Sequence, residues 1–260
     1  RSWRSWTRSA RSSAWSSPAS KAPATPPAVS TDGCRAPRSG ARGNYPGCVT
    51  DLATPPGLFI SFEGGDGAGK TTQSRALAEW IVAHTGREVV TTREPGGTEL
   101  GRTLRQLVLH GEHVDARTEA LLYATDRAHH VSSLIRPALD RGAVVLTDRY
   151  LDSSLAYQAG GRELSVEDVR WLQMWAVDGL IPDMTFLLDL DPAHLASRLT
   201  GAPDRLERAG SEFHRRTRAA FLDLARAEPQ RWQVLDASQD PDVIAGQIRE
   251  LVAARVGVTP

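Results

Sequence analysis

The chain has 260 residues, of which 40% are hydrophobic and 24% charged, and its formal net charge at pH 7 is zero. This length accommodates one domain of about 200 residues with an appendage, or two small domains, and the composition is that of an ordinary globular protein. No apolar run reaches the roughly 18 residues of a membrane-spanning helix, so we expect no membrane partner.

Residues 1–55 differ in composition from the rest of the chain and are expected to form a disordered basic tail. They are rich in Arg, Ser, Pro and Ala and lack helical or strand periodicity. They hold eight basic and two acidic residues, a net charge of +6, which leaves −6 on residues 56–260. An organellar transit peptide, a nucleic-acid-binding arm and a linker from a longer protein are the alternatives that remain open.

The charge and the cysteines limit the expected partners and compartment. A domain of net negative charge is not built to coat nucleic acid, so we expect no nucleic-acid partner, and anions would have to bind in a local pocket of cations. Cys34 and Cys48 are too few for a disulfide scaffold or a four-cysteine zinc site. They indicate a reducing compartment, and we expect the protein to be cytoplasmic.

Short apolar runs alternate with amphipathic stretches through residues 56–260, which we interpret as one folded domain. Strands are expected at residues 58–62, 88–92, 143–147, 184–190 and 232–235. Apolar residues at helical spacing lie between and after them, around residues 77–84, 100–108, 131–139 and 243–252. This alternation predicts a three-layer α/β fold, in which helices cover both faces of a five-stranded parallel sheet. Ligands of such sheets bind at the carboxyl ends of the strands.

The first predicted strand leads into a loop that matches GxxxxGK[ST] in full, and a helix is expected from Lys70 to about Thr85 with Gly86 as its stop. Glycines let successive N–H groups turn toward phosphate oxygens, Lys70 supplies a point charge to the β and γ phosphates, and the Thr71 hydroxyl can ligate Mg²⁺. The sequence therefore predicts a P-loop that binds a nucleoside triphosphate. The predicted nucleotide-binding residues of this segment, which the resemblance given below assigns to ATP, are Gly64, Gly65, Asp66, Gly67, Ala68, Gly69, Lys70, Thr71 and Thr72.

A P-loop predicts binding of a nucleoside triphosphate without fixing the reaction. GTPases, motor ATPases, transporters and small-molecule kinases all contain one. The chain has no NKxD-like guanine-reading motif and no ABC-type signature. Together with the small size of the domain, this favours a small-molecule kinase.

Three later motifs narrow the choice of kinase. TREPGGT at residues 92–98 and DRYLDSSLAYQ at residues 148–158 each follow a predicted strand, and DRLE lies at residues 204–207. With the P-loop, these motifs stand in the order found in thymidylate kinases (dTMP kinases), and the chain resembles that family from about residue 57 to residue 256. The resemblance implies phosphorylation of dTMP to dTDP with ATP and Mg²⁺, in dTTP synthesis. It also implies a homodimer formed by helices around residues 115–140 and 165–180.

The resemblance assigns the acceptor site as well. It implies that Arg105, Arg127 and Arg149 bind the acceptor phosphate or base, and the last two suit phosphate because a planar guanidinium can hold two oxygens. Tyr123 stands where the family has an aromatic ring that stacks on thymine, and Tyr157 where it has one beside the sugar. The alternative for Arg127 and Arg149 is that each forms a surface ion pair with the aspartate that precedes it. The alternative for the two tyrosines is that they are ordinary half-buried residues. The implied dTMP-binding residues are Glu94, Pro95, Arg105, Tyr123, Arg127, Arg149, Ser154, Tyr157 and Gln158.

Phosphoryl transfer brings two anionic groups together, so the site needs cations and a metal rather than an acid–base pair. The implied catalytic residues are Asp66, Lys70, Asp148, Arg149 and Arg198. The implied metal ligands are Thr71 and Asp148. Asp66 would repel bound phosphates unless a metal or an arginine intervenes, so its presence predicts such a partner. Glu63 is expected only to end the first strand.

A lid loop is expected at residues 198–208, where a glycine and a proline indicate a mobile turn. In the family such a loop closes over ATP, and an extra catalytic arginine stands either in the P-loop or in the lid. Gly67 and Ala68 leave none in the P-loop, so the lid must supply it. The candidates are Arg198, Arg205 and Arg208, of which Arg198 and Arg205 are also expected to bind ATP. A solvated helix face is the alternative for Arg198.

Some features are interpreted as structural. The HxxH at residues 110–113 and the pair His129 and His130 lack a further ligand cluster, so we expect surface histidines. Trp171 and Trp175 stand one helical turn apart and are expected in the core or at a subunit interface. Three rival functions remain open: transfer to another monophosphate, nucleotide binding without transfer, and nucleic-acid binding by the tail.

Overall fold

The computed structural model describes residues 55–162, 164–195 and 206–258. The predicted tail, except Pro55, and most of the predicted lid lie outside these residues. The strands are β1 (Leu58–Glu63), β2 (Val89–Arg93), β3 (Val144–Asp148), β4 (Met184–Asp189) and β5 (Trp232–Asp236). The helices are α1 (Lys70–Thr85), α2 (Glu99–His110), α3 (Ala116–His130), α4 (Arg136–Asp140), α5 (Leu151–Ser154), α6 (Val166–Ala176), α7 (Pro192–Leu195), α8 (Ser211–Ala227) and α9 (Pro241–Val256). The π-helical segments η2 (Val131–Ile135) and η3 (Leu155–Gly161) and the short 3₁₀ helix η4 (Glu207–Ala209) complete the described elements.

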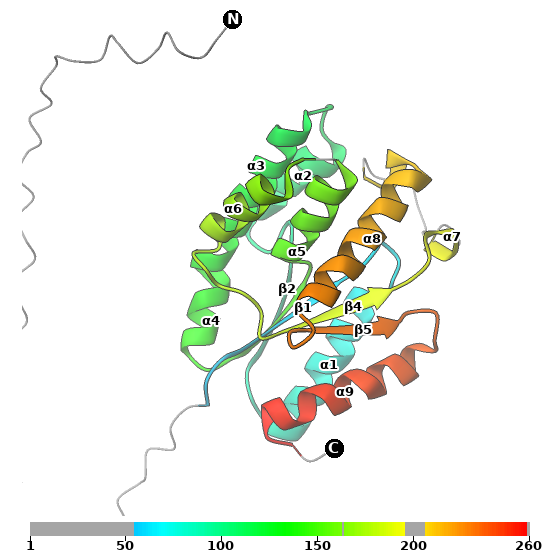
Figure 1. The fold of residues 1–260 in the computed structure, drawn as a ribbon. Helices are drawn as coiled ribbons and strands as arrows, with labels where there is room; N and C mark the ends of the chain where they lie inside the picture. Colours follow the sequence, from blue (N-terminus) through cyan, green and yellow to red (C-terminus); the bar gives the residue numbers. More distant parts are fainter. Residues whose placement is uncertain (1–54, 163, 196–205, 259–260) are drawn as a thin grey trace, which may run out of the picture. The chain divides into compact units, whose positions relative to one another are not determined.

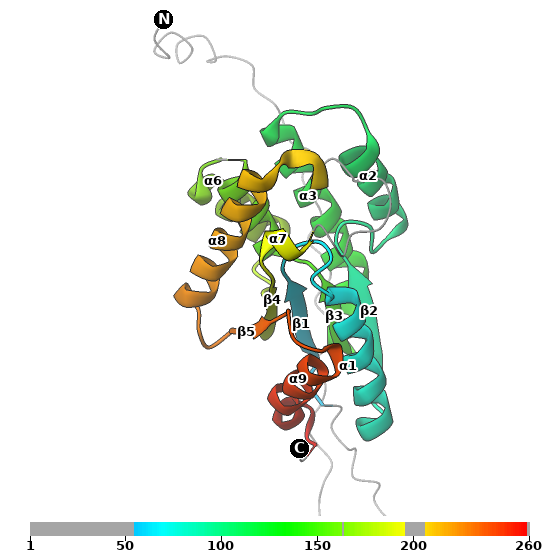
Figure 2. The same ribbon diagram turned by 90° about the vertical axis from the view of Figure 1, so that its right-hand side faces the viewer.

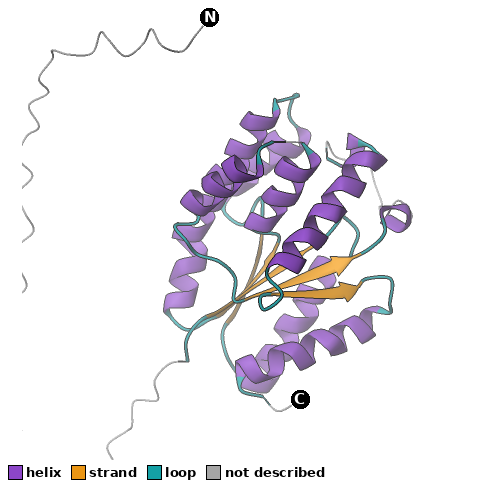
Figure 3. Cartoon of the chain, viewed as in Figure 1, coloured by secondary structure: helices purple, strands orange, loops and turns teal. Residues whose placement is uncertain are grey.

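All five strands lie in one parallel sheet in the order β2-β3-β1-β4-β5. Figure 3 shows the strands gathered between layers of helices. β1 is the central strand, and its pairing with β3 runs from Leu58↔Val144 to Phe62↔Asp148. The predicted five-stranded parallel sheet is thus confirmed, with strand ends within one residue of those expected. Because β1 and β3 end in register, the segments that follow them begin side by side.

Alternate residues of β1 face opposite helical layers, as the two-residue repeat of a strand requires. Leu58, Ile60 and Phe62 pack into a core shared with α1 and α9. Phe59 points the other way, into a core shared with η2, α4 and α5. Figure 1 shows α1 and α9 together on one side of the sheet, and the turned view in Figure 2 keeps them adjacent. Glu63 shares the face of Phe59, so it lies under the segment that follows β3.

Helix α1 has the predicted limits, and glycines fix both of them. It begins at Lys70 directly after Gly69, whose φ is +97°, a conformation that glycine adopts without strain. It ends at Thr85 because Gly86, with φ of +66°, turns the chain and donates its N–H to the carbonyl of Val82. None of the described helices is long and apolar enough to cross a membrane.

Helix α8 was not anticipated by the apolar pattern. Its buried positions are Phe213, Thr217, Phe221 and Ala225, one residue in every four. Two of these four residues are Thr and Ala, so the helical stripe is present but weakly hydrophobic. The helix packs on η3 and on β4 and β5, and its two phenylalanines join the core beside Tyr157.

The first glycine of the P-loop is required by a close approach of two backbones. Gly64 has φ of +131°, and a Cβ on it would lie 2.5 Å from the carbonyl oxygen of Leu188 in β4. Gly64→Ala should therefore lower the free energy of unfolding by more than about 1 kcal/mol. Urea denaturation followed by circular dichroism measures this change.

The matched control is Gly246→Ala in the interior of α9. An added Cβ there meets nothing within 4 Å, and alanine is the better helix former by about 0.5–1 kcal/mol. This variant should be more stable than the wild type. A Gly64→Ala protein as stable as the wild type would contradict the close approach.

Candidate active site

Lys70 lies inside the P-loop at the carboxyl end of β1. Its Nζ donates hydrogen bonds to the carbonyl oxygens of Gly64 (3.2 Å) and Gly65 (2.8 Å). Burial lowers the pKa of Lys70 and the charge of Arg149 lowers it further, whereas nearby carboxylates oppose both effects. The carbonyl groups of the loop therefore hold the Lys70 ammonium in place, within reach of phosphates bound by the loop N–H groups.

The two predicted metal ligands meet at the junction of β1 and β3. The Thr71 hydroxyl donates to Oδ2 of Asp148 at 2.6 Å. Their oxygens are the hard donors that Mg²⁺ prefers, and Mg²⁺ commonly takes one or two protein oxygens, with phosphates and water completing its shell. Among the described residues no group of three or more His, Cys, Asp or Glu could hold a metal ion. This donor set therefore fits a Mg²⁺ that arrives with a nucleotide.

Arg149 connects the P-loop with the segment after β3. Its Nη1 donates to the carbonyl oxygen of Gly64 (3.0 Å) and to the hydroxyl of Ser153 (3.2 Å). Its Nη2 donates to Oδ1 of Asp66 (2.6 Å) and to the hydroxyl of Tyr157 (3.2 Å). Its φ of +71° is uncommon for a residue with a side chain, and such a backbone persists only where the surroundings fix it.

The predicted partner of Asp66 is thus an arginine. Burial alone would raise the pKa of Asp66, but the charges of Arg149 and Lys70 outweigh burial and lower it to about 2. Asp66 is therefore ionised across the neutral range, and its charge is compensated. The alternative of an ion pair between Arg149 and Asp148 is wrong, because the carboxylate that Arg149 contacts is that of Asp66.

Glu63, expected only to end β1, lies beneath Arg149 and is fully buried. Its Oε1 accepts the N–H of Tyr150 at 2.8 Å, and its Oε2 accepts the hydroxyl of Ser153 at 2.6 Å. Burial, and secondarily the charge of Asp152, raise the pKa of Glu63 to about 7. Ser153 thus links Glu63 to Arg149, since its oxygen accepts from the guanidinium while its proton goes to the carboxylate.

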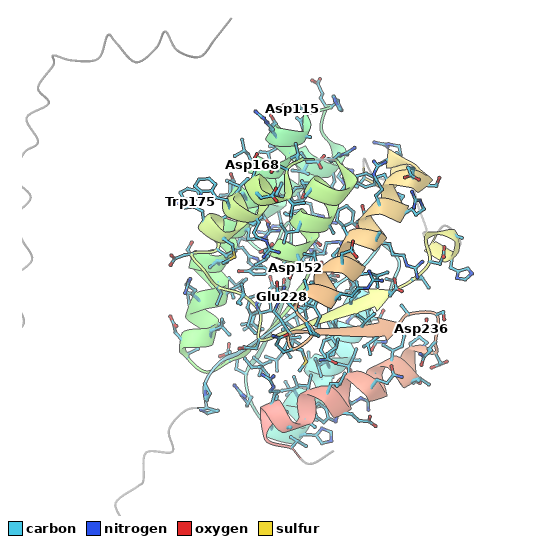
Figure 4. The ribbon with its side chains drawn as sticks, in the orientation of Figure 1. Asp115, Asp152, Asp168, Trp175, Glu228 and Asp236 are labelled. Atoms are coloured by element: carbon cyan, nitrogen blue, oxygen red, sulfur yellow. The ribbon has the colours of Figure 1, made fainter. Side chains whose placement is uncertain are left out.

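A second buried ion pair holds the segment that follows β3. Arg231, just before β5, donates to Oδ2 of Asp152 at 2.7 Å and to Oδ1 at 2.9 Å. Its Nη1 also reaches the Thr185 hydroxyl at 2.9 Å, and its Nε reaches Glu228 at 2.8 Å. Figure 4 shows Asp152 in the interior of the domain, near the strands. This ion pair fixes α5, the helix that carries Ser153 and Ser154.

A cavity beside the P-loop brings together all nine residues that the resemblance assigned to dTMP. Its walls are Asp66, Glu94, Pro95, Arg105, Leu109, Tyr123, Arg127, Arg149, Ser153, Ser154, Tyr157, Gln158 and Leu206. The volume open within it is about 60 Å³, below the roughly 300 Å³ of a pocket for a drug-sized ligand. A nucleotide therefore enters only if some lining side chains move. Sequence reasoning missed Leu109, Ser153 and Leu206, because an aliphatic or a serine side chain alone carries no signal of binding.

Arg127 is buried at the floor of this cavity and is 1% exposed. Its Nε donates to Glu94 at 2.6 Å, its Nη1 to Ser154 at 3.0 Å and to Gln173, and its Nη2 to the carbonyl of Tyr150 at 3.0 Å. Four of the five N–H groups of a guanidinium are therefore engaged. A single remaining N–H suits one carbonyl oxygen better than the two oxygens of a phosphate. The preference for phosphate at Arg127 is thus not supported, and its acidic partner is Glu94 rather than Asp126.

His130 corrects the expectation of a surface histidine, because it is completely buried. Its Nε2 lies 2.7 Å from the Thr92 hydroxyl, and its Nδ1 lies 2.9 Å from Oε1 of Glu94. A Cβ on Gly97 would lie 2.4 Å from His130 Nε2. His130 therefore holds the TREPGGT loop from inside, and together with Arg127 it fixes both oxygens of Glu94. His110 and His113 are exposed as expected.

Residues 62–248 match the family model of thymidylate kinases. The chain belongs to the thymidylate kinase family. It is 61% identical over 193 residues to a thymidylate kinase of Bifidobacterium longum strain DJO10A, which covers 72% of this chain and 93% of the relative. A thymidylate kinase of Clavibacter sepedonicus is 57% identical over 197 residues, covering 74% and 93%. The crystal structure of thymidylate kinase from Ehrlichia chaffeensis matches with a TM-score of 0.65 at 32% identity, covering 76% of this chain and 99% of that one.

Family membership confirms the resemblance and the P-loop kinase fold, while the lid lies largely outside the described residues. Arg198 and Arg205 are among the undescribed residues, so their assignment to ATP stays a prediction. Arg208 is exposed in η4. Of the other predicted ATP-binding residues, Thr72 is exposed in the first turn of α1, and the rest form the P-loop described above.

Glu63 makes the stability of the domain depend on pH. Its pKa rises from 4.5 to about 7 on folding, so between these values the folded chain holds a proton that the unfolded chain has released. The free energy of unfolding should therefore fall as the pH rises through this window, by a Glu63 contribution on the order of 3 kcal/mol. Denaturation of the wild type and of Glu63→Gln at pH 5 and pH 8 measures it.

Glu63→Gln should lose much less stability than the wild type between these two pH values. Asp126, whose pKa burial raises to about 6, titrates in both proteins and cancels in the comparison. Equal losses in the two proteins would show that Glu63 does not titrate as stated.

Proposed function

We propose that the protein transfers the γ-phosphoryl group of ATP to dTMP, giving ADP and dTDP, in the cytoplasmic synthesis of dTTP. Its place in the thymidylate kinase family supports this reaction. The assignment of residues rests on Arg149, which contacts the P-loop through Asp66 and the acceptor cavity through Ser153 and Tyr157. A cation at this junction faces both phosphates that must approach each other.

On the donor side, the P-loop N–H groups and Lys70 would hold the β and γ phosphates. Thr71 and Asp148, whose oxygens lie 2.6 Å apart, would hold Mg²⁺. When bound, Mg²⁺ would neutralise charge on the donor phosphates. An arginine of the lid, Arg198, Arg205 or Arg208, would add positive charge near the bound ATP, as the family pattern implies.

On the acceptor side, Arg127 and Arg149 would divide the ligand between them. Arg149 would hold the phosphate by releasing the hydroxyls of Ser153 and Tyr157, since its present partners leave it only one N–H. The remaining N–H of Arg127 would donate to a carbonyl of the base. Tyr123, which is buried in the cavity wall, would present its ring to the base. Arg105 is held at the cavity by a 3.0 Å hydrogen bond to the carbonyl of Pro95. A phosphate acceptor is already ionised near neutral pH, so the site needs no general base.

Release of ADP from ATP and Mg²⁺ tests the proposal, with dTMP, dUMP, dCMP, dGMP, dAMP or no acceptor. We expect selective turnover with dTMP in both the full chain and a chain that begins at Thr54. Turnover with another acceptor would keep the P-loop kinase and overturn the base-site assignment. Binding of ATP without transfer would favour the rival of an inactive nucleotide-binding module.

Lys70→Ala and Arg149→Ala should each lower kcat at least about tenfold, because each removes a charge that faces the reacting phosphates. Steady-state kinetics with dTMP and circular dichroism of each variant measure activity and fold. The control is Arg141→Ala, which removes an exposed arginine paired with Glu88 at the opposite end of the sheet. It should keep wild-type turnover, and near-normal turnover of either test variant would refute its assigned role.

We also propose that the protein forms a homodimer through α3 and α6. Trp171 and Trp175 are 68% and 72% exposed, so the alternative of core residues is wrong for the single chain. Figure 4 shows Trp175 projecting away from α6. Leu121 of α3 is also exposed, and with Trp171 it lines a shallow hollow of about 500 Å³. Two exposed tryptophans beside such a hollow are typical of an interaction surface.

The double variant Trp171→Asp with Trp175→Asp should raise the dimer dissociation constant at least about tenfold, because it places charges in an apolar contact. Analytical ultracentrifugation measures the constant. Val82→Asp in α1 is the control, since it places the same charge at an exposed apolar position on the other side of the sheet. A wild-type chain that sediments as a monomer at micromolar concentration would overturn the dimer.

A further inference from the structure

A buried carboxylate fixes the orientation of one amide in the wall of the acceptor cavity. Gln158 of η3 lines the cavity and is 2% exposed. Its Nε2 donates to Oε1 of Glu119 in α3 at 3.0 Å, and Glu119 is itself 1% exposed. This contact joins two elements that are 39 residues apart in the sequence.

Glu119 is held as an acceptor by a second contact. Arg162 reaches it with two nitrogens, Nε at 3.4 Å from Oε1 and Nη2 at 3.3 Å from Oε2. The guanidinium of Arg162 in turn lies 4.9 Å from the centre of the Phe213 ring in α8. Arg162 is thus held between Glu119 and α8, which leaves the carboxylate little freedom to turn away from Gln158.

An ionised carboxylate only accepts hydrogen bonds, whereas the end of a glutamine side chain has a donor side and an acceptor side. Rotation of the Gln158 amide by 180° would bring its carbonyl oxygen against a carboxylate oxygen, two acceptors with no proton between them. The amide nitrogen therefore stays on Glu119. Its carbonyl oxygen, Oε1, is the polar atom that remains for the cavity.

A carbonyl acceptor in this cavity distinguishes the pyrimidines. Thymine and uracil carry a proton on N3 beside the carbonyl oxygen O4, whereas neutral cytosine has a bare N3 beside an amino group. The Gln158 carbonyl can accept the N3 proton, and the remaining N–H of Arg127 in the same cavity can donate to O4. The same two groups would face the cytosine edge with acceptor against acceptor and donor against donor.

We propose that Glu119 is a positioning residue for base selection, which by fixing the Gln158 amide makes the acceptor site favour a pyrimidine that carries a proton on N3. The inference rests on the proposed function, in which a pyrimidine monophosphate occupies this cavity. Glu119 acts through Gln158 and has no contact with the base in this assignment. Its removal should therefore change the choice of base more than the phosphoryl transfer itself.

The test is Glu119→Gln, which keeps the size of the side chain but offers both a donor and an acceptor to Gln158. The Gln158 amide can then be held in either orientation. We expect the ratio of kcat/KM for dTMP to kcat/KM for dCMP to fall at least about tenfold, mainly through KM, because a mispaired buried group weakens binding of the matching base. An unchanged ratio would overturn the proposal.

Ile248→Ala is the control for lost stability, because it leaves a void in the core that α9 forms with α1 and β1, and Ile248 is not part of the cavity wall. It should lower the midpoint of thermal unfolding and keep the dTMP to dCMP ratio. An equal fall of the ratio in both variants would show general loosening of the fold and overturn the proposal.

A measurement on the wild type covers the case in which Glu119→Gln does not fold. The 5′-monophosphate of N3-methylthymidine lacks the N3 proton but keeps both carbonyls, and it should be at least about tenfold poorer than dTMP in kcat/KM. Equal use of the two nucleotides would overturn the proposal while leaving the proposed function intact. No turnover of dTMP by the wild type would overturn the proposed function and this inference with it.

Discussion

The ion pair of Arg149 and Asp66, with 2.6 Å between Nη2 and Oδ1, is the contact on which the rest of the site depends. It joins the loop after β1 to the segment after β3, and the in-register parallel pairing of these strands makes the contact possible. One guanidinium thereby sets the distance between the loop that would hold the donor phosphates and the cavity for the acceptor. The positive φ of Arg149 is maintained because four side-chain and backbone partners hold its guanidinium in place.

Buried charges beneath this contact give the site its rigidity. These groups are Glu63, Asp152 with Arg231, Arg127 with Glu94, and Glu119 with Arg162. All but Arg231, which precedes β5, lie at the carboxyl ends of strands or in and just after helices. Buried ion pairs often add little net stability, because desolvation offsets their attraction. Each of these groups instead fixes a neighbour at the cavity, such as Ser153, Ser154 or Gln158. The arrangement favours fixed geometry over stability, which is typical of a site that must place two anions.

The sequence predicted the sheet and helix α1, because each of these carries a strong local signal. The nine residues that the resemblance assigned to dTMP lie together in one cavity, and their roles stay predictions. Strands of Val, Ile, Leu and Phe and a complete P-loop are visible without any long-range information. The helix α8 was missed because its buried stripe contains Thr217 and Ala225, and His130 was misplaced because a histidine beside another histidine gives no sign of burial. The contacts of Glu63 and Glu119 were not anticipated, since one carboxylate in a strand and one in a helix have no motif.

What the sequence determined by itself was the chemistry: a phosphate-binding loop, a set of arginines and carboxylates, and an order of motifs that identifies the family. These properties depend on residue types and short spacings, which local backbone geometry converts directly into loops, strands and helix ends. Only the tertiary structure decided which groups pair. Asp66 has Arg149 as its partner rather than a metal alone, Arg127 pairs with Glu94, and Glu119 reaches Gln158, because parallel strands and packed helices bring together residues that are far apart in the chain. Burial then fixes those pairs, since a charge removed from water must keep its partner.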